Sequence, residues 1–347
     1  MINNLRSLIL LVMMVVLPLF LINCGKKDPN IKDENKPKTE TNSELIKTDD
    51  KGNTRIDLKL KPKVGDIFRY KMVKSTKESS ADAAKKEDMI SQEQIEAYYY
   101  TQEVAEVNAT GVITLKMKYD SIIVTVKQSA KDESNTIVYN SSVKDSISTM
   151  KDFLVYNNMI GNYFKIRVGS NNEFFEPYEL EAIYDKLFKE LGDTVSQQAK
   201  DAIKESLKSS LKEVLTMQYQ VFPKNDVPKD SVWSQTITSD NPPFRFKNIV
   251  NYSVKDIQKT DAGDIVSING KLDIEFIDKE YKTKEGSMKI EDVTAGGTGL
   301  MKYNLSKGCM VKKETEQIVK MLAKVSSKGQ SFKTIKETSL KLSIDLL

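Results

Sequence analysis

The chain has 347 residues, of which 53 are lysine or arginine and 49 are aspartate or glutamate, and it contains no histidine. Without an imidazole, Ser-His-Asp and Cys-His catalysis and the zinc sites built on histidine are excluded. The charges nearly cancel and no basic run is interleaved with aromatic residues, so nucleic-acid binding is not expected.

An apolar leader opens the chain. Its n-region carries Arg6, its apolar stretch runs over residues 8–22, and Cys24 follows Leu21-Ile22-Asn23. A stretch of 15 residues that includes Pro18 is too short to cross a bilayer core, which takes roughly 20. The segment resembles a bacterial lipoprotein leader, in which the cysteine after the cleavage site receives lipid on its thiol and on its new amino group. It departs from that pattern at the residue before the cysteine, where Gly, Ala or Ser is usual.

The resemblance implies a signal peptide over residues 1–23 and lipid attachment at Cys24, so that palmitate or similar chains hold the protein to a membrane. Several chains give lasting anchorage, because each buried methylene contributes about 0.8 kcal/mol. It also implies a protein of the bacterial cell envelope, on the outer rather than the inner membrane, with its body in the periplasm or at the cell surface. The alternatives are a plain signal peptide cut nearby and an uncleaved anchor.

Residues 24–54 differ in composition from the rest of the chain. Charged residues alternate there with Pro, Asn, Thr and Ser, and such a segment cannot bury enough apolar surface to offset its chain entropy. We therefore predict a lipidated cysteine and disordered tether over residues 24–54, followed by a β-rich globular body over residues 55–347.

Period-two alternation of apolar and polar residues predicts two hairpins in the first part of the body. They are residues 55–61 with 67–73, joined by a turn at 62–66, and residues 94–107 with 112–127, joined by Asn108-Ala109-Thr110-Gly111. In the second hairpin Tyr98 and Tyr100 share one face and Tyr99 lies on the other. These rings are expected to pack on the sheet, and a sugar-binding surface is the alternative.

Two amphipathic helices are predicted in the middle of the body, where apolar residues recur at spacings of three and four. They are carried by Leu180, Ile183, Tyr184, Leu187, Phe188 and Leu191 and by Ile203, Leu207, Leu211, Val214 and Leu215. Gly192 ends the first helix, and Asp193 or Thr194 is expected to cap the second. We predict an αα-hairpin at residues 177–222 that packs on the sheet; a lid is the alternative.

Strands return after the helices. Residues 246–259 and 264–277 predict a hairpin joined by Thr260-Asp261-Ala262-Gly263, and alternation from Leu340 to Leu346 predicts a C-terminal strand. Gly296-Gly297-Thr298-Gly299 lacks the Lys-Ser/Thr of a phosphate loop and is interpreted as a β-turn.

Cys309 and Trp233 are expected to be structural. Once Cys24 carries lipid, Cys309 has no partner in the chain, and no histidine is present to activate it, so a buried position on a strand is expected. Trp233 is expected to anchor the core rather than to form a ligand platform.

The strand pairs on either side of the helices have similar spacing. Tyr100 precedes Gly111 by 11 residues, and Tyr252 precedes Gly263 by the same interval. One explanation of this spacing is a duplication that produced two related halves, residues 55–176 and 223–347. Chance, together with shared hairpin chemistry, is the other explanation.

The order of features in the chain resembles an uncharacterised family of bacterial lipoproteins. The features are the lipid-box cysteine, the polar tether, Lys63-Val64-Gly65-Asp66-Ile67-Phe68, Ile160-Gly161, Phe164-Lys165-Ile166-Arg167-Val168-Gly169, Asp230-Ser231-Val232-Trp233 and a glycine-rich approach to the last strands. The chain departs from the family after the central strand, where Gly169-Ser170-Asn171-Asn172-Glu173-Phe174 stands in place of the usual Gly-x-Val. The elements predict an α+β fold, mainly antiparallel β, with a central αα-hairpin. The resemblance implies that the sheet is strongly curved, like the half-barrels of lipoprotein carriers.

No catalytic or cofactor motif is convincing. Ser209-Ser210-Leu211-Lys212 and Ser239-Asp240-Asn241 match patterns of penicillin-interacting enzymes, but no K-T-G follows and Leu211 turns Ser209 and Lys212 toward water. Carboxylate pairs such as Asp49-Asp50 and Glu291-Asp292 arise by chance among 49 acids.

The sequence therefore predicts a non-enzymatic envelope lipoprotein with no cofactor and no metal. We expect it to bind an apolar or amphiphilic ligand, or an envelope partner protein, on the concave face of the sheet. The alternatives are a structural or surface-interaction role and, third, a carboxylate-based hydrolase.

Overall fold

One antiparallel sheet of thirteen strands contains most of the described chain. The computed structural model describes residues 45–131, 133–192, 195–239, 244–283, 286–327 and 329–347. Across the sheet the strands are β10 (Val232–Ser239), β11 (Phe246–Thr260), β12 (Gly263–Phe276), β14 (Gly286–Asn304), β15 (Cys309–Ser327), β16 (Gln330–Leu346), β3 (Ile67–Asp82), β4 (Lys85–Val107), β5 (Ile113–Ala130), β7 (Tyr163–Val168) and β8 (Phe174–Tyr178). In addition, β13 (Glu280–Lys282) pairs with β14, and β6 (Glu133–Asn140) pairs with β5.

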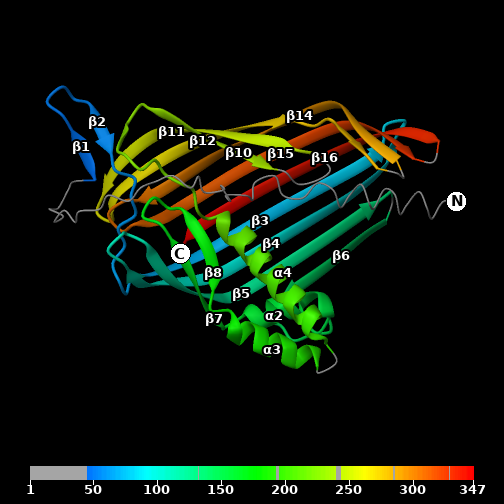
Figure 1. The fold of residues 1–347 in the computed structure, drawn as a ribbon, viewed down its shortest axis with the longest axis horizontal. Helices are drawn as coiled ribbons and strands as arrows, with labels where there is room; N and C mark the ends of the chain where they lie inside the picture. The colour runs from blue at the N-terminus through cyan, green and yellow to red at the C-terminus, as the bar shows by residue number, and fades with distance from the viewer. Residues whose placement is uncertain (1–44, 132, 193–194, 240–243, 284–285, 328) are drawn as a thin grey trace.

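The last strand of the chain joins the two parts of the sheet. β16 pairs with β3 from Thr334↔Asp82 to Leu346↔Tyr70, so the strands before and after the helices belong to one continuous sheet. We call β10, β11, β12 and β14–β16 the C-terminal arm and β3–β8 the N-terminal arm. The described sheet runs from β10 to β8 without closing, and Figure 1 shows it curving between the two arms. The expectation of a curved, mainly antiparallel sheet with helices is confirmed.

Four short helical segments lie beside the N-terminal arm (Figure 1). They are η1 (Lys151–Phe153), α2 (Leu154–Met159), α3 (Glu181–Leu191) and α4 (Gln197–Thr216). The two predicted helices are thus confirmed, whereas α2 escaped prediction because six residues are too few to show a helical period. Ser196 caps α4 by accepting a hydrogen bond from the Ala199 N–H at 3.3 Å, and the predicted caps Asp193 and Thr194 lie outside the described residues.

The predicted hairpin of residues 55–61 with 67–73 is wrong. β2 (Thr54–Ile56) pairs instead with β1 (Ile46–Thr48) and β9 (Val227–Pro228) in a separate three-stranded sheet. Both sides of β3 are taken by β4 and β16, which leaves no pairing position for residues 55–61. The apolar alternation still had a cause, because Ile56, Leu58 and Leu60 are buried. The ordered chain also begins before residue 55, since β1 lies inside the segment predicted to be a tether.

The glycine-rich segment is a second correction. Gly296–Gly299 lies inside β14 and pairs with β12 on one side and β15 on the other, so it is not a turn. A Cβ atom on Gly297 would lie 2.5 Å from the carbonyl oxygen of Glu316, which explains why a side chain is missing there.

The remaining predicted strands are confirmed. The hairpins β4–β5 and β11–β12 and the C-terminal strand β16 form as the alternation indicated. Tyr98 and Tyr100 are buried in the main core, where the Tyr70 and Tyr100 rings stack at 5.5 Å. Cys309 is buried on β15, and burial raises the pKa of its thiol to about 11.

Candidate functional site

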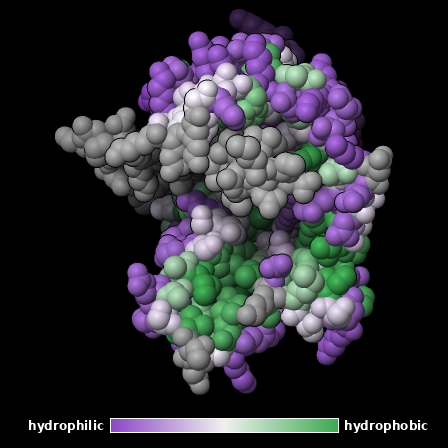
Figure 2. Space-filling view, turned by 90° about the vertical axis from the view of Figure 1, so that its right-hand side faces the viewer, coloured by the Kyte–Doolittle hydropathy of each residue, from purple (hydrophilic) through white to green (hydrophobic). Residues whose placement is uncertain are grey.

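The inner face of the sheet, on which the helices lie, is apolar in the C-terminal arm. Two clusters there contain Phe244, Phe246, Met288, Ile290, Val319, Met321, Ala323 and Val325, packed with Ile274, Phe276, Val293, Ala295 and Phe332. We call these thirteen residues the apolar inner surface. No described helix contributes to either cluster. Figure 2 views one end of the molecule; hydrophobic side chains gather in its lower half, where Figure 1 places the N-terminal arm and the helices, and hydrophilic side chains prevail in its upper half.

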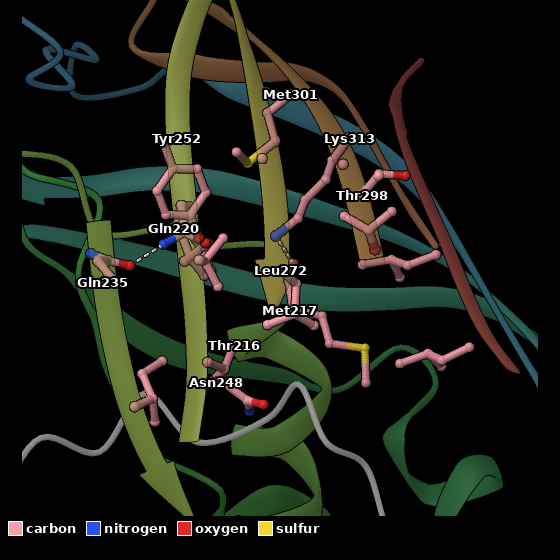
Figure 3. Close-up of a pocket in the computed structure, with 18 residues that line it drawn as sticks. Thr216, Met217, Gln220, Gln235, Asn248, Tyr252, Leu272, Thr298, Met301 and Lys313 are labelled. Atoms are coloured by element: carbon pink, nitrogen blue, oxygen red, sulfur yellow. Dashed lines mark hydrogen bonds between the residues drawn. The ribbon is translucent and has the colours of Figure 1, made fainter. Parts of the chain in front are cut away.

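A small cavity adjoins this surface at the end of α4 (Figure 3). It measures about 90 Å³ and lies between residues 216–220 and the inner face of β10–β16. Gly270 and Gly299 pair across β12 and β14 and line the cavity without a side chain. The ring of Tyr252 covers Gly270, since a Cβ atom there would lie 3.3 Å from the ring. Sites that enclose a drug-sized ligand measure roughly 300–1,000 Å³, so this cavity can hold only one end of a larger molecule.

Lys313 brings a buried ammonium group into the cavity. Lys313 is only 7% exposed, and its Nζ donates a hydrogen bond to the carbonyl oxygen of Met217 at 2.7 Å (Figure 3). Burial lowers the pKa of Lys313 to about 8, and no carboxylate of the described residues compensates this shift. A buried charge without an opposite charge is costly, so the site is complementary to an anion.

Gln317 lies four residues further along β15, between the cavity and the apolar inner surface. It is 3% exposed, and neither atom of its amide has a hydrogen-bond partner among the described residues. Buried polar groups in folded proteins are nearly always paired, so an unpaired amide points to a missing polar partner. The strand rise places Gln317 about 13 Å from Lys313, measured between backbones.

Two glutamines hold the chain after α4 against the sheet. Gln220 donates from Nε2 to Oε1 of Gln235 at 2.5 Å, and Gln235 donates from Nε2 to the carbonyl oxygen of Val221 at 2.9 Å. This pair fixes one wall of the cavity (Figure 3). Trp233, next to it on β10, is half-buried and stacks on Tyr252 at 5.6 Å, as expected of a core anchor.

The structure does not bring the other candidate residues together. Ser209 is exposed on α4, and Glu291 forms an ion pair with Lys333 at 2.6 Å. Asp240 and Asn241 lie outside the described residues, as does Cys24. Over the described part of the chain, no group of three or more Cys, Asp or Glu side chains is arranged to hold a metal ion.

Lys313 and Gln317 were not singled out from the sequence. The available signal was the phase of β15, because Lys313 and Gln317 occupy the same alternation as the apolar residues Val319 and Met321. A polar residue in an apolar phase indicates either a strand end or a ligand contact.

The chain belongs to a family of unknown function, DUF6263, whose sequence model matches residues 110–310. The expected membership of an uncharacterised family is thus confirmed, while lipid attachment stays a prediction. No curated protein matches the chain.

Two solved structures are similar in part. A structure described as lipid–protein interactions in lipovitellin has 9% identity and a TM-score of 0.42, and the match covers 83% of this chain and 25% of that one. OccK7 (OpdD) of Pseudomonas aeruginosa has 8% identity and a TM-score of 0.20, with 81% and 99% covered. Such low TM-scores give no indication of function. None of the helices in the described ranges has the length and apolar character to cross a membrane.

Proposed function

We propose that this protein is a non-enzymatic binder of an amphiphile whose acyl chain lies on the apolar inner surface of the C-terminal arm. The observation that carries the proposal is the buried ammonium of Lys313, which lies in the cavity at one end of that surface and has no opposite charge among the described residues. The head group of the ligand is therefore an anion, such as a carboxylate or a phosphate.

The dimensions support an elongated ligand. The cavity of about 90 Å³ accommodates a head group, while the apolar inner surface extends away from it over β11, β12, β14, β15 and β16. Gln317 lies between the two, at the place where an ester or amide linkage would satisfy its unpaired side chain.

The proposal includes the attachment of the protein to a bacterial envelope membrane through lipid on Cys24. It is supported by the leader at residues 8–22 and by the cysteine that follows it. Mass spectrometry of the mature amino terminus tests this part by itself, since an unmodified terminus would exclude it.

Binding of a fluorescent fatty acid tests the function. We expect purified protein to bind cis-parinaric acid with a fluorescence increase, and Lys313→Met to weaken binding by about tenfold or more because a charged hydrogen bond is lost. Lys341→Met is the matched control, since Lys341 is exposed on the next strand, β16, and should bind as the wild type does. Parinaric acid methyl ester, which has no charge, should bind both variants and the wild type alike.

Two results would overturn the proposal. One is the absence of parinaric acid binding to the wild-type protein, and the other is an equal loss in the Lys313 and Lys341 variants. If no amphiphile binds, a protein recovered by cross-linking in intact envelopes would favour the alternative surface-interaction role.

A further inference from the structure

A second cavity lies in the N-terminal arm, between the inner face of the sheet and helices α2 and α4. It measures about 290 Å³, three times the volume beside Lys313. Its polar wall contains Lys74, Glu96, Tyr98, Tyr119, Asp152, Tyr156 and Glu213. Its apolar wall is formed by Val155, Met159, Leu207, Leu211 and Val214.

Carboxyl groups outnumber ammonium groups in this cavity. Glu96 is buried and accepts hydrogen bonds from Tyr98 Oη at 2.7 Å and Tyr156 Oη at 3.0 Å. Its other oxygen forms an ion pair with Lys74 Nζ at 3.1 Å. Lys74 is thus occupied by Glu96, while Glu213 and Asp152 also face the cavity. Burial raises the pKa of Glu213; the nearby Lys74 ammonium opposes this rise, and the Glu96 carboxylate adds to it.

Tyr119 provides an independent sign of a missing ligand. The residue is 1% exposed, it lines the same cavity, and its hydroxyl group has no hydrogen-bond partner among the described residues. Burial raises the pKa of Tyr119, and Tyr219, Tyr156 and Glu96 add to the rise. Its ring lies 5.7 Å from the ring of Tyr98.

We propose that this cavity binds the ammonium group of a primary aliphatic amine. An ammonium donates up to three hydrogen bonds; Tyr119 Oη has no hydrogen-bond partner among the described residues, and the Glu213 carboxylate lines the same cavity as a second acceptor. The faces of the tyrosine rings favour a cation in addition. The alkyl part of the amine lies against Leu207, Leu211 and Met159. The site shares no residue with the cavity of Lys313 and does not depend on amphiphile binding.

Titration calorimetry with n-butylamine tests the site. We expect the full-length protein to bind n-butylamine and not the uncharged n-butanol. Glu213→Gln should weaken amine binding by about tenfold or more, and Tyr119→Phe by about fivefold, because each removes one acceptor. Glu205→Gln is the control, since Glu205 is exposed on the same helix and should leave binding unchanged.

Tetramethylammonium separates hydrogen bonding from simple charge attraction, because it carries the charge without an N–H donor. We expect the wild-type protein to bind tetramethylammonium more weakly than n-butylamine. The Tyr119→Phe variant should bind tetramethylammonium as strongly as the wild type does. The proposal is overturned if n-butylamine does not bind, or if Glu205→Gln weakens binding as much as Glu213→Gln. Tyr119→Phe keeps the buried ring, so it remains a usable variant if Glu213→Gln fails to fold.

Discussion

The inner faces of the two arms differ although they belong to one sheet. In the row where β16 meets β3, Leu340 pairs with Thr76, which pairs in turn with Gln94. The next inward row passes from Val319 through Thr338 to Glu78 and Gln92. Apolar residues on the C-terminal side thus give way to polar residues on the N-terminal side within two strands.

The difference follows from what covers each arm. The N-terminal arm buries its apolar inner residues under the helices, and the main core contains Leu207, Leu211 and Leu215 together with Tyr98 and Tyr119. The apolar inner surface of the C-terminal arm receives no described helix. The C-terminal arm also contributes to the main core, through residues such as Val266, Ile268 and Tyr303, so the two arms differ over the apolar inner surface and not over their whole length.

A matched pair of methionines tests this difference most strongly. Met72 is 1% exposed in the main core and Met321 is 6% exposed on the apolar inner surface. We expect Met72→Ala to lower the free energy of unfolding by about 2–5 kcal/mol, as core truncations do. Met321→Ala should cost less than half as much, because its cluster is small, and should weaken parinaric acid binding. Urea unfolding measures both values, and equal losses would contradict the division between the arms.

The pH dependence of stability tests the buried charge of Lys313. Its pKa is about 8 in the folded protein and 10.5 in the absence of burial, so the unfolded chain binds more protons between these values. The free energy of unfolding should therefore rise with pH in this window, by roughly 3 kcal/mol at most. Lys313→Met should lack the rise.

The quantity to measure is the difference in the free energy of unfolding between the wild-type protein and the Lys313→Met variant at each pH. Burial raises the pKa of Tyr139 to about 12, and such tyrosines make both proteins less stable above about pH 10. Denaturant unfolding of both proteins from pH 7 to 10 is sufficient, and parallel curves would show that Lys313 is not buried as described.

Substitutions on the outer face of the sheet should change the free energy of unfolding least, and by similar amounts in the two arms. Lys116 lies over the Tyr163 ring at 4.1 Å in the N-terminal arm, and Lys341 forms an ion pair with Glu316 at 3.0 Å in the C-terminal arm. Both contacts are exposed to solvent, so Lys116→Ala and Lys341→Ala should each change the free energy of unfolding by less than about 1 kcal/mol. A larger loss on one side would mean that the arms differ on both faces.

The sequence was sufficient to predict the strands and helices in which the periodic spacing of apolar residues continued over several residue pairs or helical turns. β4, β5, β11, β12 and β16 were predicted in this way. The pairing of β16 with β3 was not predictable, because alternation identifies a strand without identifying a partner far away in the chain. Gly296–Gly299 was misinterpreted as a turn for a related reason. The glycines are needed because neighbouring strands approach the backbone closely, and the sequence does not reveal those neighbours.

The candidate sites were largely hidden from sequence. Lys313 meets Met217 only because the end of α4 crosses the C-terminal arm. Glu96, Tyr119, Tyr156 and Glu213 come from four separate elements, and no local spacing connects them. Local patterns therefore predicted the scaffold, whereas long-range packing created both cavities.

The position of β16 has a consequence for the fate of shortened chains. Loss of residues 330–346 would leave the backbone amide and carbonyl groups of β3 and β15 without partners over a long, regular stretch. Exposed sheet edges of this kind recruit strands from other molecules and lead to aggregation. We therefore expect a chain clipped near Ser327 to self-associate and polymerise more readily than the full-length chain.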